Sequence, residues 1–372
     1  MVYSLATLWH DRNRFLPGVL AVAFSGLLIM LQSGLLLGLF SLTSTPIDHA
    51  GADVWVGHPT AGSLELGRPI SERWVNRVAM EPEVTRSEAY LQAFAVLRKP
   101  DGGSELCTVI GTRLDDDALG AVRQLTPALR ERLAEPGAIV VDESELGRLG
   151  LSGVGDVAEV FGHRVRLVGV VQGLKSLAAP YLFCSLRTAR LLCEGLPGHQ
   201  TVYVLARCRS ADEAAALAER LRADYDVAAF TSGEFSTRTR LHWLLRTKAG
   251  IAGGWTVVLG LIVGAVITSQ TLYAATMASR REYAVLRALG VPRRRIAGAV
   301  LAQAFWVGGA GVLLALPAAF GMAELLGRLG VHVLLPGWIL AAAAALTLAM
   351  AVCSGLISLR SLRRMEPVDL LR

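Results

Sequence analysis

The chain has 372 residues, of which 53% are hydrophobic and 18% are charged, and its mean hydropathy is +0.46. A soluble chain of this length would struggle to bury so much apolar surface, so the composition points to lipid. The 37 Lys and Arg against 31 Asp and Glu give a formal charge of +6, but only Lys99, Lys175 and Lys248 are lysines. None of these lysines stands in a Gly-Lys-Ser/Thr step, which excludes a nucleotide-binding P-loop.

Four charge-free stretches exceed the roughly 20 apolar residues that a helix needs to cross a bilayer. They predict transmembrane helices at residues 15–42, 249–276, 296–323 and 333–359. Arg12 and Arg14 precede the first stretch, as in a signal peptide, but its apolar run outlasts the hydrophobic core of a cleavable signal. We therefore interpret it as an uncleaved anchor. The expected fold class is a polytopic α-helical membrane protein with four transmembrane helices arranged 1+3 and a large extracytoplasmic α+β domain between the first and second spans.

Arginines near the span ends predict the orientation, because short cytoplasmic loops carry an excess of Lys and Arg. Twelve arginines lie in the N-terminal segment 1–14, in residues 277–295 between the second and third spans, and in the tail 360–372. The connection between the third and fourth spans holds only Arg328. We expect a multi-pass protein of the bacterial inner membrane with both termini in the cytoplasm, which places residues 43–246 outside.

Glycines recur at four-residue spacing inside the spans, which allows helix backbones to approach closely. The pairs are Gly34 with Gly38, Gly250 with Gly254, and Gly260 with Gly264. Packing within one chain and a dimer seam both explain such pairs. No Asp, Glu, Lys or Arg lies deep in any span, so the usual mark of a proton or ion relay is missing. Secondary transport driven by such a relay is therefore disfavoured.

Short runs of β-type and helical pattern alternate after Ala52 and predict a mixed α+β domain. The expected strands are 53–56, 88–97, 105–111, 138–142, 157–161, 165–171, 201–206 and 227–230, and the expected helices are 72–80, 186–193 and 211–224. The segment 232–246 runs into the second span without Gly or Pro after Glu234. It predicts one long helix leaving the membrane, a rigid stalk that can carry motion between membrane and domain.

Residues that carry chemistry are few in this domain. Its histidines never stand three or four residues apart, it has no Cys-x-x-Cys pair, and the local motifs of common hydrolases are absent. We predict no metal site and no catalytic residues. Four cysteines fall outside the membrane and are equally consistent with buried free thiols or with one or two disulfides: Cys107, Cys184, Cys193 and Cys208. Cys353 in the fourth span is expected to serve packing.

Two short segments resemble ligand loops only superficially. The cluster 115–117 consists of three consecutive aspartates, whereas calcium loops alternate their ligands around a turn glycine. The glycine-rich segment 150–156 follows a helix and opens a strand, which is the reverse of a phosphate loop. We interpret the first as a solvated loop and the second as a turn.

The connection between the second and third spans forms an amphipathic pattern. Tyr283, Leu286 and Leu289 follow a helical stripe, Gly290 can end that helix, and Pro292 can open the next. A short helix with one apolar and one charged face either rests on lipid headgroups or docks into a partner. Its single acid, Glu282, fits the headgroup interpretation poorly.

Several segments, taken in order, resemble the FtsX-like permeases, the membrane subunits of the MacB and LolCE class of ABC transporters. Residues 279–290, Ser-Arg-Arg-Glu-Tyr-Ala-Val-Leu-Arg-Ala-Leu-Gly, are similar to the coupling segment of that family, and residues 361–372 are similar to its closing pattern. Residues 146–156 and 168–171 resemble motifs of its MacB-like periplasmic core domain. The first span at 23–32 and the following residues 52–56 resemble the DevC-type branch, whose permease and ATPase are separate chains.

This resemblance implies a homodimeric or paired permease that is not itself an enzyme. A separate cytoplasmic ABC ATPase would bind ATP and Mg, so no cofactor is expected on this chain, and no nucleic acid is an expected partner. A DevC-type permease would also work with a periplasmic adaptor and an outer-membrane channel. By motif position the ATPase-coupling residues are Arg281, Glu282, Tyr283, Leu286, Leu289 and Gly290. Tyr283 departs from the Ile or Phe of many members.

Three functions follow from these observations. The first is mechanotransmission for export: ATP-driven motion that exports or extracts an amphiphilic substrate such as a glycolipid, lipoprotein or peptide. The second is a non-transporting signal transmitter, like FtsX itself, that regulates a cell-wall hydrolase. The third is a membrane-bound enzyme, which lacks any assembled catalytic group in the sequence.

Overall fold

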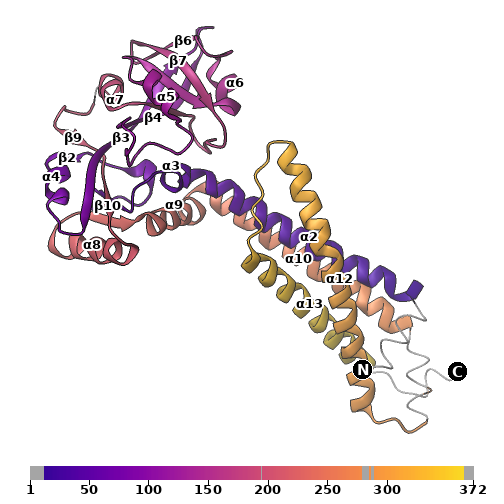
Figure 1. The fold of residues 1–372 in the computed structure, drawn as a ribbon. Helices are drawn as coiled ribbons and strands as arrows, with labels where there is room; N and C mark the ends of the chain where they lie inside the picture. The colour runs from indigo at the N-terminus through magenta and orange to yellow at the C-terminus, as the bar shows by residue number, and fades with distance from the viewer. Residues whose placement is uncertain (1–11, 194, 279–284, 286–288, 364–372) are drawn as a thin grey trace. The chain divides into compact units, whose positions relative to one another are not determined.

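The computed structural model describes residues 12–193, 195–278, 285 and 289–363 (Figure 1). The chain forms two compact units. The helical unit comprises the residues up to 39 and those from 251 onward, and the α/β domain comprises residues 40–250. A large α/β domain between the first and second of four membrane helices is the predicted fold class, which is confirmed.

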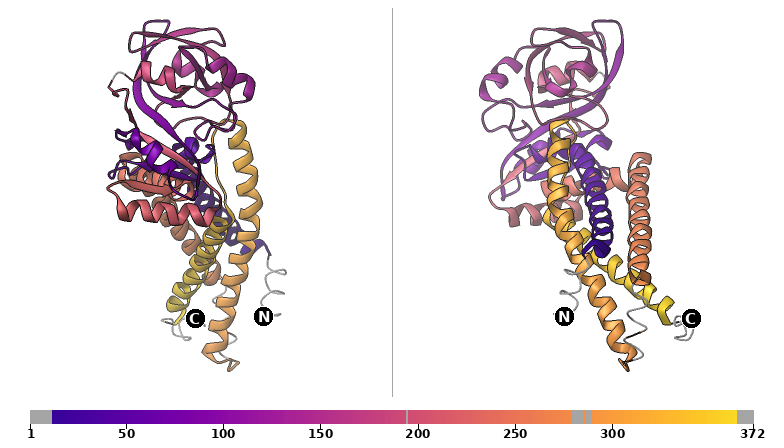
Figure 2. Two further views of the ribbon diagram at one scale, coloured as in Figure 1. Left: turned by 60° about the vertical axis from the view of Figure 1, so that its left-hand side comes forward. Right: turned by 90° about the vertical axis from the view of Figure 1, so that its right-hand side faces the viewer.

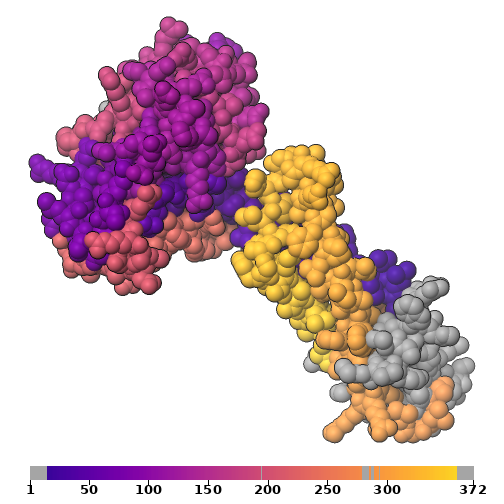
Figure 3. Space-filling model, in the orientation of Figure 1, coloured from indigo at the N-terminus to yellow at the C-terminus, as the bar shows by residue number. Residues whose placement is uncertain are grey.

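Four long apolar helices build the helical unit: α2 (Arg12–Ser41), α10 (Lys248–Ala278), α12 (Arg293–Arg328) and α13 (Gly337–Arg363). Each contains a segment long and apolar enough to cross a membrane. Helices α12 and α13 pack side by side, as the space-filling view shows (Figure 3). Helix α12 runs beyond both ends of the predicted third span, and α13 begins only after Pro336, because residues 331–336 form no regular structure.

Helix packing in this unit is dominated by small and branched side chains. Val22 of α2, Leu272 of α10, Val307 of α12 and Ala351 of α13 meet in one buried cluster. A polar contact lies beside such packing: the Ser25 hydroxyl is 3.1 Å from the Gly264 carbonyl oxygen and 3.2 Å from the Thr268 hydroxyl. Interhelical hydrogen bonds of this kind add to helix association in an apolar solvent.

Gly34 and Gly38 provide a close contact within the chain. The Leu334 N–H donates to the Gly34 carbonyl at 3.0 Å. A Cβ placed on Gly38 would lie 2.1 Å from the His332 carbonyl oxygen. Gly260 likewise faces Gln32, whose amide oxygen would lie 2.0 Å from an added Cβ. These glycines therefore serve packing within one chain.

The contact at Gly38 predicts a strong effect for Gly38→Ala. The added Cβ meets backbone rather than a flexible side chain, so a helix or the connection must shift, which we expect to cost about 1–3 kcal/mol. The measurement is the thermal unfolding temperature of the purified protein. Gly254→Ala is the matched control, since nothing lies within 4 Å of its Cβ position and alanine is the better helix former. Equal melting temperatures for the two variants would contradict the packing assignment.

The α/β domain consists of two lobes that share one long strand, β3 (Val84–Arg98) (Figures 1 and 2). In the first lobe, β3 pairs with β10 (Tyr203–Cys208), followed by β1 (Val54–Gly57) and β11 (Ala228–Thr231), all antiparallel. Alternation along β1 separates two cores. Val54 and Val56 pack toward α8 (Ala211–Asp224), whereas Trp55 points to the opposite face. Helix α4 (Arg73–Ala79) packs against β3 and β10.

The second lobe is a closed six-stranded barrel. From β3 the order runs through the strands β4 (Ser104–Thr112), β8 (Tyr181–Ser185), β5 (Ala138–Asp142), β7 (His163–Val171) and β6 (Val157–Val160). The β4–β8 and β5–β7 pairs are parallel. Leu97 on β3 pairs with Val160 on β6 and closes the ring. Closure leaves no free sheet edge in this lobe.

Smaller elements complete the domain. Helices α5 (Pro127–Leu133), α6 (Leu146–Leu149) and α7 (Leu186–Leu192) accompany the barrel strands, and β2 (Ile70–Ser71) pairs with β9 (Gln200–Thr201). Two short turns of helix, η1 (Leu42–Ser44) and α3 (Thr45–Asp48), follow α2, and η2 (Leu64–Leu66) lies between β1 and β2. Strands β2 and β8 and helix α5 were not among the predicted elements.

The predicted continuous stalk is wrong. Helix α9 (Ser232–Arg246) ends at Arg246, the next residue Thr247 is extended with φ −100° and ψ 151°, and α10 begins at Lys248. The Thr247 hydroxyl accepts the Gly250 N–H at 3.0 Å and donates to the Trp243 carbonyl at 2.5 Å. A Cβ on Gly250 would lie 2.2 Å from the Trp243 carbonyl oxygen. Capping by Thr247 and the missing side chain of Gly250 therefore allow the break.

The structure resolves the alternatives left for the cysteines. All four cysteines of the α/β domain are buried free thiols, so that interpretation was the right one. Cys353 is exposed on the surface of the helical unit, and its predicted packing role is wrong. Cys353 faces away from the buried cluster to which Ala351, two residues earlier on α13, belongs.

The two segments that only resemble ligand loops, residues 115–117 and 150–156, make structural contacts. Asp156 accepts the backbone N–H groups of Ser152 at 2.6 Å and Gly153 at 3.2 Å, which closes a turn after Gly150 in the left-handed conformation. Asp115 forms an ion pair with Arg86. In the part of the chain that the structure describes, no group of three or more His, Cys, Asp and Glu is placed to hold a metal ion.

Candidate functional site

The predicted ATPase-coupling segment is described only in part. Arg281, Glu282, Tyr283 and Leu286 lie outside the described residues. Leu289 is 75% exposed, and Gly290 has a φ of +85°, which favours glycine at the end of a helix. Pro292 stands immediately before α12. Leu289 therefore leaves an apolar side chain uncovered by the residues that the structure describes.

The candidate site in the α/β domain centres on α9, the stalk helix, because this helix is the last element before the second span. Thr231 and Glu234 form a capping box that satisfies backbone donors at its start. Phe235, Ser236 and Thr239 form its buried face. The opposite residues are polar or exposed, so α9 is held to the domain along one side.

Phe235 anchors α9 in an aromatic cluster around Trp55. The Trp55 ring lies 5.0 Å from Tyr90, 5.8 Å from Tyr203 and 5.6 Å from Phe235 between ring centroids. Its indole N–H donates to the Ser232 hydroxyl at 3.1 Å. Trp55 is 1% exposed. Aromatic contacts of this geometry add to the stabilisation that burial already gives.

A charged contact joins α9 to the segment that follows the first span. The Arg240 guanidinium donates to Asp48 at 2.5 Å and to the Ser44 hydroxyl at 2.7 Å. Ser44 in turn donates to the same carboxylate at 2.7 Å. Residues from η1, α3 and α9 are thereby tied together. The base of the domain thus connects the chain leaving the first span with the chain entering the second.

The middle and second half of α9 also contact the loop around η2. The Leu64 N–H donates to the Thr239 hydroxyl at 3.2 Å. The indole N–H of Trp243 donates to the Glu65 carboxylate. His242 lies beside Gly62, with its Nδ1 3.5 Å from where a Cβ would be. Three residues of one helix face therefore hold this loop.

The η2 loop forms one wall of a cavity of about 490 Å³. The cavity is lined by Leu64, Glu65, Gly67, Pro69, Gln92, Ala93, Phe94, Phe161, Cys193, Gly195, Leu196 and Val202. These residues come from the η2 loop, from β3, from the β6–β7 turn, from the segment after α7 and, for Val202, from between β9 and β10. Its volume lies within the usual range for small-molecule sites. The cavity therefore lies where both lobes meet the loop held by α9.

Glu65 is the one acidic residue among the described lining residues. Burial raises the pKa of the Glu65 carboxyl to about 7, and the hydrogen bond from Trp243 opposes this shift. The pKa of Tyr203 is raised by its own burial and by the nearby Glu65. Glu65 can therefore change its protonation state near neutral pH.

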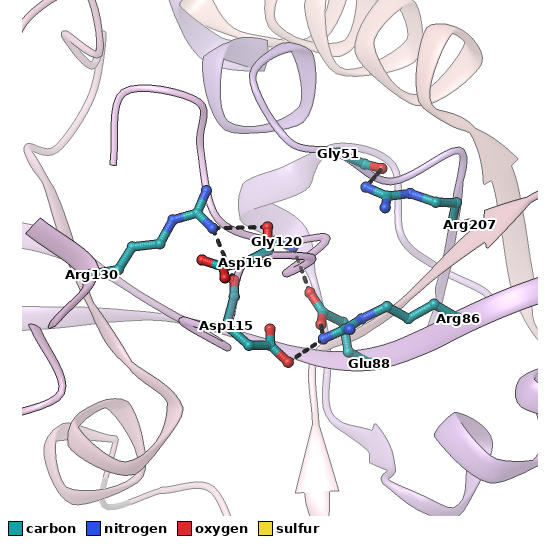
Figure 4. A network of polar contacts seen from close by, with 8 residues as sticks. All are labelled: Gly51, Arg86, Glu88, Asp115, Asp116, Gly120, Arg130 and Arg207. Atoms are coloured by element: carbon teal, nitrogen blue, oxygen red, sulfur yellow. Dashed lines mark hydrogen bonds and ion pairs between the residues drawn. The ribbon is translucent and has the colours of Figure 1, made fainter. Parts of the chain in front are cut away.

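A separate polar network fixes the loop of residues 115–120 (Figure 4). Glu88 is 1% exposed and accepts the Gly120 N–H at 2.7 Å. Burial raises the pKa of Glu88, and the Gly120 N–H and Arg86 oppose this. Arg86 bridges Glu88 and Asp115. These contacts position residues 115–120 over β3 and serve structure rather than ligand binding.

The sequence contained no sign of Glu65. A single acid between Leu64 and Leu66 is typical of an exposed turn, and nothing indicates that the loop is covered by a helix 175 residues later. Gln92 gives no signal either, since it stands within a strand pattern. The aromatic residue at the tip of a two-residue hairpin, Phe161-Gly162, was the only available signal.

Comparison with known proteins finds two family models that match this chain. The family model for the MacB-like periplasmic core domain matches residues 19–224, and the model for the FtsX-like permease C-terminal region matches residues 255–367. Two uncharacterized ABC transporter permeases of Mycobacterium tuberculosis, from strains H37Rv and CDC 1551, are each 25% identical over 300 residues, which is 80% of this chain and 78% of theirs.

Two solved structures are also similar. The periplasmic region of MacB from Actinobacillus actinomycetemcomitans is 14% identical and aligns over 51% of this chain and 94% of its own, with a TM-score of 0.35. The extracellular domain of the noncanonic ABC-type transporter YknZ from Gram-positive bacteria is 14% identical and aligns over 48% of this chain and 98% of its own, with a TM-score of 0.33.

Proposed function

Because the chain belongs to the family of FtsX-like ABC transporter permeases with a MacB-like periplasmic core domain, we propose that it converts ATP hydrolysis by a separate ATPase into motion of its α/β domain. That motion exports, or extracts from the membrane, an amphiphilic substrate such as a glycolipid, lipoprotein or peptide. The substrate contacts the α/β domain rather than a charged path through the spans, which contain no deep ionisable residue.

The observation that carries this proposal is the double attachment of α9. The start of its buried face is fixed in the Trp55 cluster by Phe235, and further along the helix Arg240 binds Asp48 while Thr239 and Trp243 hold the η2 loop. Any displacement of α9 therefore acts on the segment after the first span and on the cavity wall together. A helix with these contacts is suited to relay motion.

The source of energy is another chain. This sequence has no Gly-Lys-Ser/Thr step, so the cytoplasmic ABC ATPase supplies the ATP and Mg site. The ATPase docks on residues 277–295, with Arg281, Glu282, Tyr283, Leu286, Leu289 and Gly290 in contact. A second copy of the chain, a periplasmic adaptor and an outer-membrane channel complete the proposed assembly.

Glu282→Lys tests the docking assignment. Reversal of the single acid in an arginine-rich segment should abolish stimulation of a co-expressed ATPase, a loss of at least about tenfold or ~1.4 kcal/mol of coupling. The measurement is ATP hydrolysis by the co-purified complex in nanodiscs. Arg287→Lys keeps the charge and is the control. Unchanged stimulation in a Glu282→Lys protein that inserts normally would refute the assignment.

The proposed orientation makes a second prediction. Reporters fused after residues 150, 290 and 372 should report only the first position as extracytoplasmic, because the arginine-rich segments stay in the cytoplasm. The measurement uses paired reporters, one active outside and one active inside. A cytoplasmic signal at position 150 would overturn the orientation, and with it the role given to the α/β domain.

Identification of co-purifying proteins separates transport from signalling. Gentle extraction of the complex should recover an ATPase together with an adaptor. Recovery of a cell-wall hydrolase bound to residues 43–246, with no adaptor, would instead make the protein a signal transmitter that moves no substrate.

A further inference from the structure

The cavity beside Glu65 is lined mostly by apolar residues, and two of its lining side chains are aromatic. Phe94 on β3 is 46% exposed, and Phe161 at the β6–β7 turn is 45% exposed. Leu196 and Val202 extend the apolar lining. Large aromatic side chains left this open at a hollow are a common feature of ligand sites.

Phe161 is also held in an unfavourable backbone conformation. It has a φ of +46° and is followed by Gly162 with a φ of +81°, in a two-residue turn between Val160 and His163. This turn prefers Asn, Asp or Gly at its first position, because a bulky side chain with positive φ is strained. Strain of this kind concentrates at binding sites. A phenylalanine here thus gives up turn stability while presenting its ring to the cavity.

Two lining groups, the Glu65 carboxylate and the Gln92 amide oxygen, can accept a hydrogen bond or attract a positive charge. Gln92 is 7% exposed, and its Oε1 has no hydrogen-bond partner among the described residues. Glu65 contributes the carboxylate, and none of the described lining residues is Lys, Arg or His. An anionic head would therefore meet a carboxylate without any compensating base. A positively charged head would meet the carboxylate and the aromatic rings, both of which attract cations.

We propose that this cavity binds a cationic amphiphile, with its apolar part against Phe94 and Phe161 and its ammonium group at the Glu65 carboxylate and the Gln92 amide oxygen. This proposal rests on the proposed function in one respect: we take the ligand of the cavity to be the amphiphilic substrate of the permease. Because Glu65 also accepts the Trp243 hydrogen bond, a ligand at the carboxylate changes a contact made by α9.

Protection of an introduced thiol tests occupancy directly. Gly195 lines the cavity and has nothing within 4 Å of its Cβ position, so Gly195→Cys places a reactive thiol there. The background is the full-length Cys353→Ala protein in nanodiscs, which removes the exposed cysteine. Gly198→Cys is the matched control, because its Cβ position is equally open and Gly198 does not line the cavity.

Decylamine is the probe, and decanoate is its anionic counterpart of equal chain length. Decylamine should slow maleimide labelling of Gly195→Cys by about fivefold or more, with no effect from decanoate and none at Gly198→Cys. Glu65→Gln should weaken that protection about tenfold. Equal protection by decanoate, protection of Gly198→Cys, or full protection in Glu65→Gln would each overturn the proposal.

Phe161→Asn distinguishes a ligand contact from a structural one. Asn-Gly is the preferred pair for this turn, so the melting temperature should stay the same or rise, while protection by decylamine weakens about tenfold. A lower melting temperature with protection unchanged would assign Phe161 to folding alone and refute its role in the site.

The labelling is performed without the ATPase, so it is independent of coupling. If decylamine protects the thiol but wild-type protein does not stimulate any ATPase, the cavity assignment stands and the proposed function fails. If stimulation is lost in Glu282→Lys as expected while decylamine gives no protection, the proposed function stands and the cavity assignment fails.

Discussion

Replacing Trp55 with alanine is expected to lower the free energy of unfolding of the α/β domain by about 3–5 kcal/mol. Trp55 is 1% exposed and contacts the rings of Tyr90, Tyr203 and Phe235, so truncation leaves a large cavity between β1 and α9. It also removes the donor to the Ser232 hydroxyl at the start of α9. The variant should therefore loosen the stalk helix as well as the core.

The loss of stability in Trp55→Ala can be measured through the buried cysteines of the α/β domain. Cys107 and Cys184 are fully buried free thiols, and burial raises both of their pKa values, so they react only when the domain opens. Thiol labelling in a urea series on the Cys353→Ala background then gives the unfolding midpoint. The control is Trp74→Ala, which removes a half-buried ring that contacts only Tyr225 and Arg77 among the aromatic and cation–π partners described. Similar losses in both variants would contradict the central role of Trp55.

Glu65 should make the domain less stable as the pH rises from about 5 to 8. Its folded pKa of about 7 is above the ordinary carboxyl value of 4.5, so between these values the folded state keeps a proton that the unfolded state has lost. The stabilisation is complete below the unfolded pKa and disappears as the pH passes the folded value. A shift of this size sets an upper bound of about 3 kcal/mol, which partial exposure reduces to roughly 1–2 kcal/mol.

Glu65→Gln removes the titrating group and keeps a hydrogen-bond acceptor for Trp243. The difference in urea midpoint between wild type and this variant should therefore change with pH between 5 and 8, with wild type losing stability. Because each midpoint is read at a fixed pH, the pH dependence of thiol chemistry cancels. His242→Gln controls for the imidazole beside Gly62 on the same helix. A midpoint difference that stays constant from pH 5 to 8 would show that Glu65 is already charged in the folded domain.

Local patterns predicted much of the secondary structure. The strand 138–142 and the helix 211–224 have the same bounds in the structure, because Gly137 and the Ser210 cap punctuate them clearly. The strand at Tyr181–Ser185 escaped prediction because it has no alternation and runs directly into α7. The barrel also depends on the pairing of Leu97 with Val160, a long-range contact that no local pattern specifies.

The candidate site was predictable only in its backbone. The helix 232–246 stood out because the absence of Gly and Pro after Glu234 is a local signal. The break after this helix was not predictable, because an apolar sequence continues into the second span. The break depends on the Thr247 side-chain cap and on Gly250. The raised pKa of Glu65 results from its burial in the folded domain, where α9 covers the η2 loop. Burial between segments distant in the sequence cannot be read from the residues around Glu65.

The extended residue at Thr247 makes the helical phases of α9 and α10 independent. In an uninterrupted helix, each inserted or deleted residue rotates everything beyond it by about 100° and shifts it by about 1.5 Å. Here the two dihedral angles of Thr247 absorb such changes. The length and face of α9 can therefore diverge among relatives, and new domains can be grafted before α10, without rotating the lipid-facing and bundle-facing sides of the second span.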